Sequence, residues 1–583
     1  MSSCLMNIFN IRLVSVFKYL AIRIVAVLAF AATASVAQAQ DAGTLLKSMP
    51  AETPKLETDV SIEQRLQGTK AITDVEGMKL EIKEIKITGL TVVSPEEIKP
   101  VISQFIGPDK NFQDLLDAAG AIKRELANRG FFLTDAIIPP QKIVGGVVEI
   151  LVIEGRLGKV KVEYADDVEI YRNLIDGYVS ELNAGDVVSA RSVERALFLI
   201  SDLNGLNTKS VFQPGEKMGT ADLIIKVSKA KTFTGSLDLD ANGSIYTGVM
   251  RAGAVANINN LAGLGDMFTV RHLRSIEGGG LSFSRVSYIA AVGPWGSKVG
   301  ASYSDLKYKL GTPVFEPIQA SGGATVSSLI GLHPLIRSRN VNLMTMYQYD
   351  ERDFHDIKAA TNYLEDKHTQ VHSVVLSGDL RDTLLGGGIN VGNIAFTHGK
   401  LSFLQADRRA VDLAGHQAQG VYDKTNFTYS RLQSVSESTA AYFSYSAQFT
   451  RKNLDGSEKI SLGGPYAVRA YPQGEGSGDE GHVGTIEMRY AVPKNEKLAG
   501  NMGLSLFYDW AGSTISKMPT AADLATPGFT NTYDIAGVGV GLNWDVPENW
   551  QLRATTAWRT TKTSVGEHVD RTPRAFIQFN KRF

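Results

Sequence analysis

The feature that most constrains this chain is an alternation of apolar and polar side chains that runs from about residue 231 to the C-terminus. In residues 502–511, Leu504 and Leu506 share one face, while Asp509 lies on the other. Strict alternation over about ten residues predicts a β-strand with one apolar and one polar face. Turns rich in Gly, Asn and Asp separate these segments. The second half of the chain is therefore predicted to be all-β.

A soluble sandwich and a membrane barrel both alternate in this way, so further features must decide between them. The apolar faces carry Tyr and Trp near the strand ends, as an interfacial girdle requires. The final segment places Phe579 and the terminal Phe583 on one face, although Lys581 interrupts it. We expect the two phenylalanines to form an assembly signal. The predicted fold class is an all-β transmembrane barrel of about 16 antiparallel strands over residues 231–583.

Two copies of a small α+β unit precede the alternating region. In residues 81–155 the predicted order is strand, helix, helix, strand, strand, with Ser94 as the cap of the first helix and Gly130 ending the second. The same order recurs over residues 156–230, where Ser192 is expected to cap the second helix. A repeated unit of this size indicates two adaptor domains in front of the barrel.

The N-terminus predicts a cleaved secretory signal over residues 1–39. Basic residues precede an apolar run at 24–32, and Ala37-Gln38-Ala39 fits a small-x-small cleavage site. The run is too short to cross about 30 Å of hydrocarbon. The one cysteine of the chain, Cys4, lies in this segment, so the mature protein can form no disulfide and has no thiol nucleophile.

The charge balance gives a formal net charge of -1, from 60 Lys+Arg and 61 Asp+Glu. A nucleic-acid binder usually carries a basic excess, so that class is excluded. Mean hydropathy is -0.06, which is ordinary for a soluble protein. A membrane barrel has the same average because its strands alternate.

Two motifs that could indicate cofactor chemistry are better explained otherwise. The stretch 476–481 matches a dinucleotide pattern, but it precedes a strand, and Asp479 and Glu480 would repel phosphate. His368 and His372 have metal-ligand spacing without a third ligand in view. No cofactor, no metal and no enzymatic activity are therefore predicted. An outer-membrane enzyme stays as an alternative that requires acidic and histidine side chains clustered at the lumen rim.

The most specific patterns lie near the C-terminus. Residues 463–481 contain Val-Arg-Ala-Tyr at 468–471, and residues 507–512 read Phe-Tyr-Asp-Trp-Ala-Gly. With these motifs the chain resembles the two-partner secretion transporters, the haemolysin secretion/activation family of the POTRA-containing outer-membrane assembly superfamily. Trp510 and the lack of an extra downstream Gly are small departures from the family pattern.

The resemblance implies that a long loop, 464–482, folds back into the barrel lumen and that its arginine pairs with an aspartate of the wall. The alternation independently puts Asp509 on the polar face. The alternative is that this stretch is only a Gly-rich extracellular turn. The residues expected to anchor the loop are Val468, Arg469, Ala470, Tyr471, Asp509 and Gly512, with support from Gly463, Gly464, Gly478, Asp479 and Glu480.

The adaptor units resemble POTRA domains through the stretches 130–132, 138–141, 212–215 and 219–223. Residues 40–80 would form a linker, with a short helix over 41–49 that resembles the family's lumen plug. The resemblance implies an outer-membrane pore, with its adaptors in the periplasm, that translocates a large adhesin- or haemolysin-like exoprotein in extended form without nucleotide.

The expected partners are this exoprotein, outer-membrane lipid and the barrel assembly machinery, with the chain itself monomeric and no nucleic acid involved. The alternative is an assembly factor that inserts other barrels, a branch that usually carries more adaptor repeats than the two predicted here.

Overall fold

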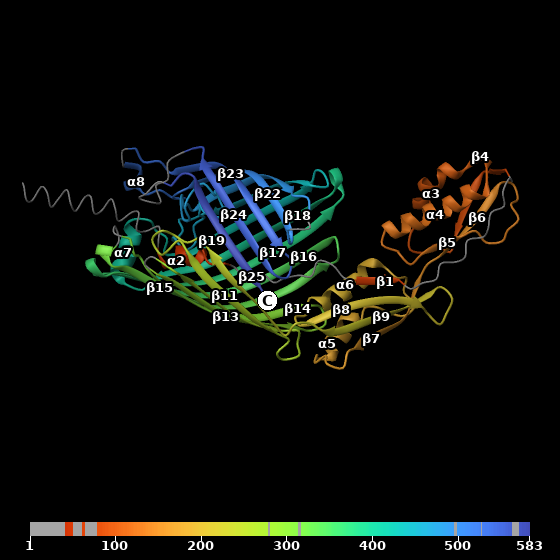
Figure 1. Ribbon diagram of the computed structural model, residues 1–583, viewed down its shortest axis with the longest axis horizontal. Helices are drawn as coiled ribbons and strands as arrows, with labels where there is room; N and C mark the ends of the chain where they lie inside the picture. The colour runs from red at the N-terminus through yellow and green to blue at the C-terminus, as the bar shows by residue number, and fades with distance from the viewer. Residues whose placement is uncertain are drawn as a thin grey trace, which may run out of the picture.

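The computed structural model describes residues 41–50, 61–64, 79–277, 280–312, 316–494, 498–525, 528–561 and 571–583. The predicted signal segment lies outside the described residues. Three bodies follow one another along the molecule: a small orange unit, a gold unit and a large barrel (Figure 1). None of the described helices combines the length and apolar character that a membrane-spanning helix needs.

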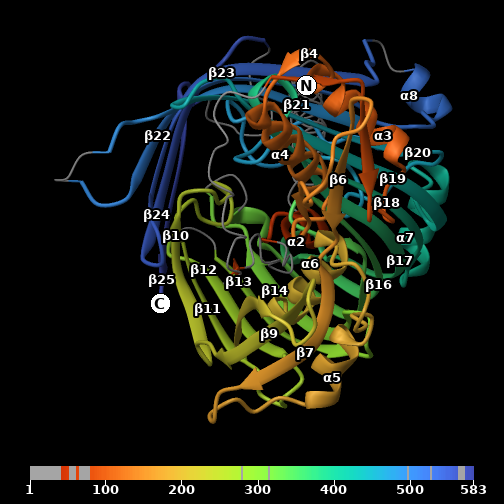
Figure 2. The same ribbon diagram turned by 90° about the vertical axis from the view of Figure 1, so that its right-hand side faces the viewer.

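The barrel is a closed antiparallel sheet of 16 strands within the described residues, in which each strand pairs with its neighbours in sequence and β25 pairs with β10 to close the ring. Figure 2 looks toward the ring from the side of the small units. The barrel strands are β10 (Phe233–Asp240), β11 (Arg251–Asn259), β12 (Met267–Ser275), β13 (Leu281–Val292), β14 (Ser297–Lys309), β15 (Ala320–Arg337), β16 (Val341–Lys358), β17 (Tyr363–Asp382), β18 (Gly388–Phe403), β19 (Gly420–Ser434), β20 (Thr439–Thr450), β21 (Glu480–Ala491), β22 (Asn501–Thr514), β23 (Thr532–Val546), β24 (Trp550–Arg559) and β25 (Arg574–Arg582).

The alternation seen in the sequence sets the two faces of the barrel wall. In β22, Leu504, Leu506 and Tyr508 are 48%, 64% and 43% exposed, whereas Phe507 and Asp509 are buried on the inner side. A barrel with a water-filled interior has an apolar outward face and an inward face with charged groups, as found here. The predicted fold class is confirmed.

The wall is taller on one side than on the other. Strands β15, β16 and β17 have 18, 18 and 20 residues, while β10 has 8. A strand needs about 9–11 residues to cross a bilayer, so the long strands project beyond it. Short helices lie between the barrel strands: η3 (Glu316–Ile318), η4 (Ala359–Thr361), η5 (Leu384–Gly386), α7 (Ala406–Ala414) and α8 (Ala521–Ala525).

Unit 1 is the body formed by β2 to β6. Ser94 caps its first helix by accepting from Glu96 N, and an Asn111–Asp114 capping box starts the second. Gly130 follows that helix with φ +96°, a left-handed geometry that favours glycine. The elements are β2 (Leu80–Ile82), β3 (Glu84–Thr88), α3 (Pro95–Ile102), η2 (Ser103–Phe105), β4 (Gly107–Lys110), α4 (Phe112–Asn128), β5 (Asp135–Ile137) and β6 (Val147–Ile153), with sheet orders β3-β6-β5 and β2-β4.

Unit 2 is the body formed by β7 to β9. Its second helix begins three residues earlier than the sequence suggested: Ser189 has extended backbone and accepts from Ser192 N, so Ser189 is the cap. The assignment of Ser192 was wrong because two serines compete for one helix start. The elements are β7 (Arg156–Tyr164), α5 (Arg172–Val179), α6 (Ala190–Ser201), β8 (Leu206–Pro214) and β9 (Thr220–Lys229), and a distant segment, β1 (Ser61–Gln64), joins their sheet in the order β1-β8-β9-β7.

Unit 2 is fastened to the barrel by a buried ion pair. Arg337, at the end of β15, donates to both oxygens of Asp202, with Nε and Nη2 each 2.8 Å away. The guanidinium also lies 4.2 Å from the ring centroid of Phe198 in α6. Lys298 Nζ donates to the backbone oxygen of Asp202 at 2.5 Å. These contacts fix unit 2 at one end of the barrel.

Candidate functional site

The candidate site is the lumen of the barrel, because two segments of the chain fold into it. One is the long connection between β20 and β21, residues 451–479. The other is α2 (Ala42–Lys47), which lies inside the ring of strands (Figures 1 and 2). Both predicted lumen segments are therefore among the described residues, and their contacts define how the pore is filled.

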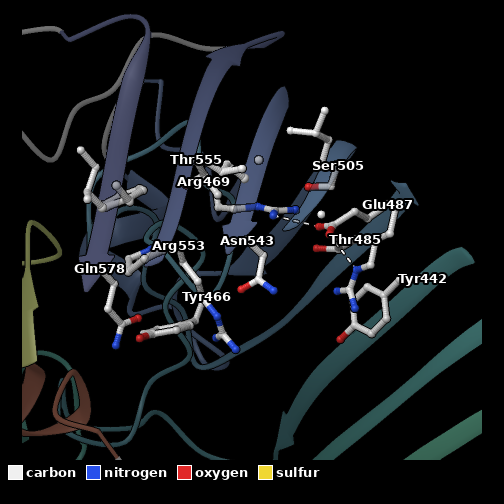
Figure 3. A pocket seen from close by; sticks show the side chains of 18 of the residues that line it. Tyr442, Tyr466, Arg469, Thr485, Glu487, Ser505, Asn543, Arg553, Thr555 and Gln578 are labelled. Carbon is white, nitrogen blue, oxygen red and sulfur yellow. Dashed lines mark hydrogen bonds and ion pairs between the residues drawn. The ribbon is translucent and has the colours of Figure 1, made fainter. Parts of the chain in front are cut away.

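Arg469 holds the loop to the wall through several hydrogen bonds. Its Nε and Nη2 donate to the two oxygens of Asp509 at 2.9 and 2.8 Å, and its backbone N–H donates to the same carboxylate at 3.1 Å. Its Nη1 donates to Glu487 at 3.0 Å. Figure 3 shows Arg469 reaching from the loop toward Glu487 on the wall. A planar guanidinium that meets a carboxylate with two parallel bonds fixes position as well as distance.

Arg469 and Asp509 each have a further partner besides each other. Asp509 is 0% exposed and also accepts from the Thr485 hydroxyl at 2.9 Å. The Arg469 guanidinium lies 3.2 Å from the ring centroid of Phe507. Stacking on an aromatic face adds to the attraction when the cation is desolvated. Because the pair is buried, removing one partner would leave an uncompensated charge, at a cost of about 3–5 kcal/mol.

The neighbours of Arg469 in the motif make apolar contacts with the wall and form no ion pairs among the described residues. Val468, Ala470 and Tyr471 are 0%, 1% and 0% exposed and join an apolar cluster with wall residues. The Tyr471 hydroxyl lies 3.1 Å from that of Thr561. A Cβ on Gly537 would approach Ala470 Cβ to 2.4 Å, so the loop backbone comes unusually close to the wall. The Arg469–Asp509 ion pair is therefore surrounded by closely packed apolar side chains.

The base of the loop is closed by Asp479. This residue is 0% exposed and accepts from Leu454 N at 3.0 Å and Lys517 N at 2.7 Å. Its carboxylate lies 3.1 Å from Lys459 Nζ. The neighbouring Glu480 accepts from Lys517 Nζ at 2.6 Å. These bonds tie the two ends of the loop to the β22–β23 connection.

The four predicted glycines all lie where a side chain would disturb the loop. Gly464 has φ +131°, a conformation that L side chains rarely adopt. At Gly463, Gly478 and Gly512 an added Cβ would come within 2.4–2.6 Å of neighbouring atoms. The structure therefore brings the predicted glycines, acids and anchor residues together around one loop.

The helix α2 is held by charges at its N-terminus. Asp41 caps it by accepting from Thr44 N at 2.8 Å, and Ala42 N donates to Asp356 of β16 at 3.0 Å. Lys367 Nζ, on β17, lies 3.4 Å from Asp41 and 3.1 Å from Asp455 of the lumen loop. Lys367 is 1% exposed, so its charge depends on these carboxylates.

The body of α2 is wedged between the wall and the loop. Leu45 and Met49 join an apolar cluster with wall residues that include Phe283. A Cβ on Gly43 would approach Ser457 Cβ of the loop to 2.5 Å. Lys47 Nζ donates to two backbone oxygens of the loop, those of Gly456 and Lys459, at 2.7 and 2.5 Å. Helix and loop are therefore interlocked.

A cavity of about 500 Å³ remains in the lumen beside Arg469. Its walls combine polar, charged and apolar side chains from the loop, from the strands β20 to β25 and from Asn242 (Figure 3). They include Tyr442, Tyr466, Glu487, Arg489, Asn543 and Arg553. Such a lining suits a hydrated extended chain better than an apolar ligand.

The two C-terminal aromatics lie at the seam of the barrel. Phe583 exchanges backbone hydrogen bonds of 3.1 Å with Gly235 of β10. Phe579 lies 6.0 Å from the ring of Trp550. Their role in assembly stays a prediction.

The histidines of β17 have separate partners. His368 contacts Asp353 at 2.7 Å, and His372 contacts the Tyr347 hydroxyl at 2.8 Å. Among the described residues, no group of three or more His, Cys, Asp or Glu could hold a metal ion.

Sequence reasoning missed part of the lumen network. Neither Glu487, which pairs with Arg469, nor Lys367, which pairs with Asp41, was among the residues predicted from the sequence. A lysine on the inward face of a strand carries no local motif. The only available signal was its inward position near the start of a barrel strand.

Comparison with known proteins agrees with this architecture. The family model "Haemolysin secretion/activation protein ShlB/FhaC/HecB" matches residues 219–544, more than half of the chain. The model "POTRA domain, ShlB-type" matches residues 80–155.

Individual relatives span most of the chain. The heme/hemopexin transporter protein HuxB of Haemophilus influenzae is 26% identical over 83% of this chain and 84% of its own. The outer membrane transporter CdiB of Escherichia coli O6:K15:H31 is 26% identical over 72% of this chain and 70% of its own. The solved structure of CdiB from Escherichia coli superimposes with a TM-score of 0.64 at 18% identity, covering 88% of this chain and 93% of that one. The structural likeness shows the fold.

Proposed function

This chain belongs to the haemolysin secretion/activation protein family ShlB/FhaC/HecB, and from that premise we propose how its parts serve secretion. Members of this family are transporters, not enzymes. The chain is an outer-membrane β-barrel transporter with periplasmic POTRA domains, and it secretes a partner exoprotein. The proposal concerns which segments receive the client, which close the pore and what form the client takes.

The division of labour follows the three bodies of the molecule. Residues 81–155 and 156–230 are the two modules that receive the client in the periplasm. Residues 231–583 form the pore, and within it the loop 464–482 and the helix of the 40–80 segment are its internal stoppers. In support, α2 and the loop both contact the wall and each other.

The observation that carries the proposal is the polar fastening of both stoppers. Arg469 binds Asp509 and Glu487, and Lys367 binds Asp41 and Asp455, all inside the barrel. Ion pairs in a lumen can be exchanged for water when the segment moves, whereas an equal area of apolar packing would have to be exposed. The stoppers are therefore fixed at rest, and their removal during transport also has to expose the apolar clusters around Val468 and Leu45.

The client passes in extended form. The cavity beside the loop, about 500 Å³, is far smaller than any folded domain. The outer membrane has no nucleotide supply, so folding of the client outside the cell gives the transport its direction. Main-chain groups of an extended client can meanwhile form hydrogen bonds with polar side chains that line the lumen.

The client is a large adhesin- or haemolysin-like exoprotein. The likeness to the heme/hemopexin transporter protein HuxB makes a haem- or hemopexin-binding exoprotein a specific candidate. The other partners proposed are outer-membrane lipid around the barrel and the barrel assembly machinery at the strand that ends in Phe579 and Phe583. The transporter itself acts as a monomer.

The test begins with deletion of this chain, followed by comparison of the proteins at the cell surface and in the medium. A large protein that disappears from both is the client, and its secretion is then measured for Arg469→Ala. Loss of the anchor should reduce secretion at least tenfold while the barrel still assembles. Arg489→Ala is the matched control, because Arg489 pairs with the same Glu487 but belongs to the wall and is half exposed. Unchanged secretion by Arg469→Ala would refute the anchor role.

The adaptor assignment needs a separate test. Deleting residues 81–155 should abolish binding of the client to the transporter while leaving the barrel in the outer membrane. Binding that survived this deletion would show that unit 1 is not needed for reception.

A further inference from the structure

One edge of unit 2 is covered by a segment from elsewhere in the chain. Strand β1 runs parallel to β8, with Ser61 opposite Lys209 and Gln64 opposite Phe212. This segment lies between α2 and unit 1 in the sequence, so it is not part of the repeated unit. In unit 1 the corresponding sheet has the order β3-β6-β5, with no added strand among the described residues.

The cover on β8 is partial. The edge strand is 9 residues long, and β1 pairs with four of them, from Lys209 to Phe212. Parallel pairs are slightly less stable per residue than antiparallel ones, and a single short edge strand opens readily. β8 can therefore pair with a longer strand than β1.

Two other sheet edges of the units, those of β5 and β7, are less suited to adding a strand. Strand β5 has only 3 residues, and Pro139 and Pro140, which follow it closely, have no N–H to donate. Strand β7 carries Arg156, Lys159 and Lys161 as exposed charges, and part of its start is covered by the neighbouring residues 185–187. Charges of this kind are a common protection of edge strands against added strands.

The β8 edge is also held close to the pore. Helix α6 ends next to Asp202, whose carboxylate binds Arg337 of the barrel, and β8 begins four residues later at Leu206. A strand that pairs with β8 is therefore fixed near the periplasmic mouth of the barrel (Figure 1). Unit 1 has no comparable fastening to the barrel in the described part of the chain.

We propose that the β8 edge of unit 2 is the docking edge for an extended segment of the partner exoprotein, and that β1 is a placeholder strand which this segment displaces. The inference rests on the proposed function and adds the edge, the pairing mode and the competitor. Main-chain N–H and C=O groups carry the pairing, so an extended segment of tolerant sequence fits. β1 spares the resting transporter an open edge, which would otherwise attract other strands.

A disulfide that fixes β1 to β8 tests the competition. Glu63 and Val211 are partners across the two strands. Partner residues of neighbouring strands lie within the Cα separation of about 4.4–6.8 Å that disulfides use. Apart from Cys4 of the predicted signal the chain has no cysteine, so the pair Glu63→Cys with Val211→Cys is the only pair that can form. With the bond formed, secretion of the client should fall at least tenfold, and dithiothreitol should restore it.

The matched control fixes the opposite side of the same sheet. Glu163 and Lys226 are partners across the parallel strands β7 and β9, so Glu163→Cys with Lys226→Cys strengthens the sheet without closing the β8 edge. This variant should secrete like the unchanged protein in both redox states. Full secretion by the oxidised β1–β8 variant would overturn the proposal. If deleting the transporter removes no secreted protein at all, the proposed function fails instead.

Photocrosslinking gives a second, independent readout that also serves if the disulfide variant assembles poorly. Benzoylphenylalanine in place of Val211, on the β8 edge, should crosslink to the client during secretion. The same probe in place of Lys161, exposed on the β7 edge, should give less than a tenth of that product. Equal products at both positions, or a product at Lys161 alone, would overturn the assignment of the docking edge.

Discussion

The two periplasmic units share one order of elements but meet their neighbours in different ways. Unit 2 contacts the barrel through the buried Asp202–Arg337 pair. Unit 1 contacts unit 2 through an edge-to-face pair of rings, Phe132 and Phe212, with centroids 5.7 Å apart. A backbone bond of 2.7 Å from Ala190 N to Gly130 O accompanies it.

The two kinds of contact differ in how strictly they fix the orientation of a unit. A buried ion pair with two parallel hydrogen bonds has a single good geometry. An aromatic pair is less demanding, because rings accept a range of offsets and tilts. We therefore expect unit 2 to move with the barrel and unit 1 to reorient about the ring contact.

Asp202→Ala should have the largest effect. Arg337 is 2% exposed, so loss of its carboxylate partner should weaken the junction by about 3–5 kcal/mol. The distance distribution between spin labels on unit 2 and the barrel should become as broad as that between unit 1 and the barrel. In the double variant Asp202→Ala with Arg337→Met, the loss should be smaller because no charge stays buried. A narrow distance distribution in Asp202→Ala would show that the Asp202–Arg337 pair does not fix unit 2 to the barrel.

Glu154→Gln, at the connection between the units, should have the next largest effect. Its carboxylate accepts from the Thr91 hydroxyl at 2.6 Å and from Val92 N at 2.9 Å, and lies 3.3 Å from Arg156. Hydrogen bonds to a charged acceptor contribute about 1.5–3 kcal/mol. Limited proteolysis of unit 1 in the full chain at neutral pH should be faster in the variant. Equal rates would mean that the connection does not depend on this carboxylate.

The same residue predicts a pH dependence. Burial acts to raise the pKa of Glu154, but the hydrogen bonds from Thr91 and Val92 and the charge of Arg156 outweigh it, so the pKa lies below its usual 4.5. The unfolded state then binds the proton more readily, and the stabilisation is present above pH 4.5 and is lost as the pH falls through the folded value. The difference in proteolysis between wild type and Glu154→Gln should therefore shrink on acidification, and a constant difference would contradict this.

Phe132→Ala should have a smaller effect on the contact between the units. Edge-to-face rings add about 0.5–1.5 kcal/mol beyond the area they bury. Spin labels on unit 1 and unit 2 should show a broader distance distribution, while the distance between unit 2 and the barrel should stay unchanged. Met218→Ala is the control, since this side chain is 96% exposed on unit 2. A change in the distance between unit 2 and the barrel would show that the two junctions are not independent.

Lys159→Ala should have the smallest effect. Lys159 pairs with Glu216 on the surface of unit 2, and both side chains are mostly exposed. Exposed pairs contribute little, because water and salt screen them. Thermal unfolding and secretion should both be unchanged, and a clear loss of either would place an unrecognised contact at this surface.

Much of the fold could be predicted because its signals are local. Alternation placed Asp509 on the inner face, and helical spacing with the cap Ser94 located the first helix of unit 1. The family resemblance of the motif that contains Arg469 implied an aspartate partner, and Arg469 lies 2.8 Å from Asp509. The cap at Ser189 was missed because Ser192, three residues on, is an equally good cap by type.

The alternating faces of the barrel strands and the order of elements in units 1 and 2 follow from side-chain spacing over a few residues, which the sequence contains. Which distant groups meet depends on the tertiary structure. Asp41 and Lys367 are 326 residues apart, Asp202 and Arg337 are 135 apart, and β1 pairs with a strand nearly 150 positions away. Such contacts depend on how the barrel closes and where the units dock, because the entropy cost of closing a long chain segment grows only slowly with its length and so favours no particular partner.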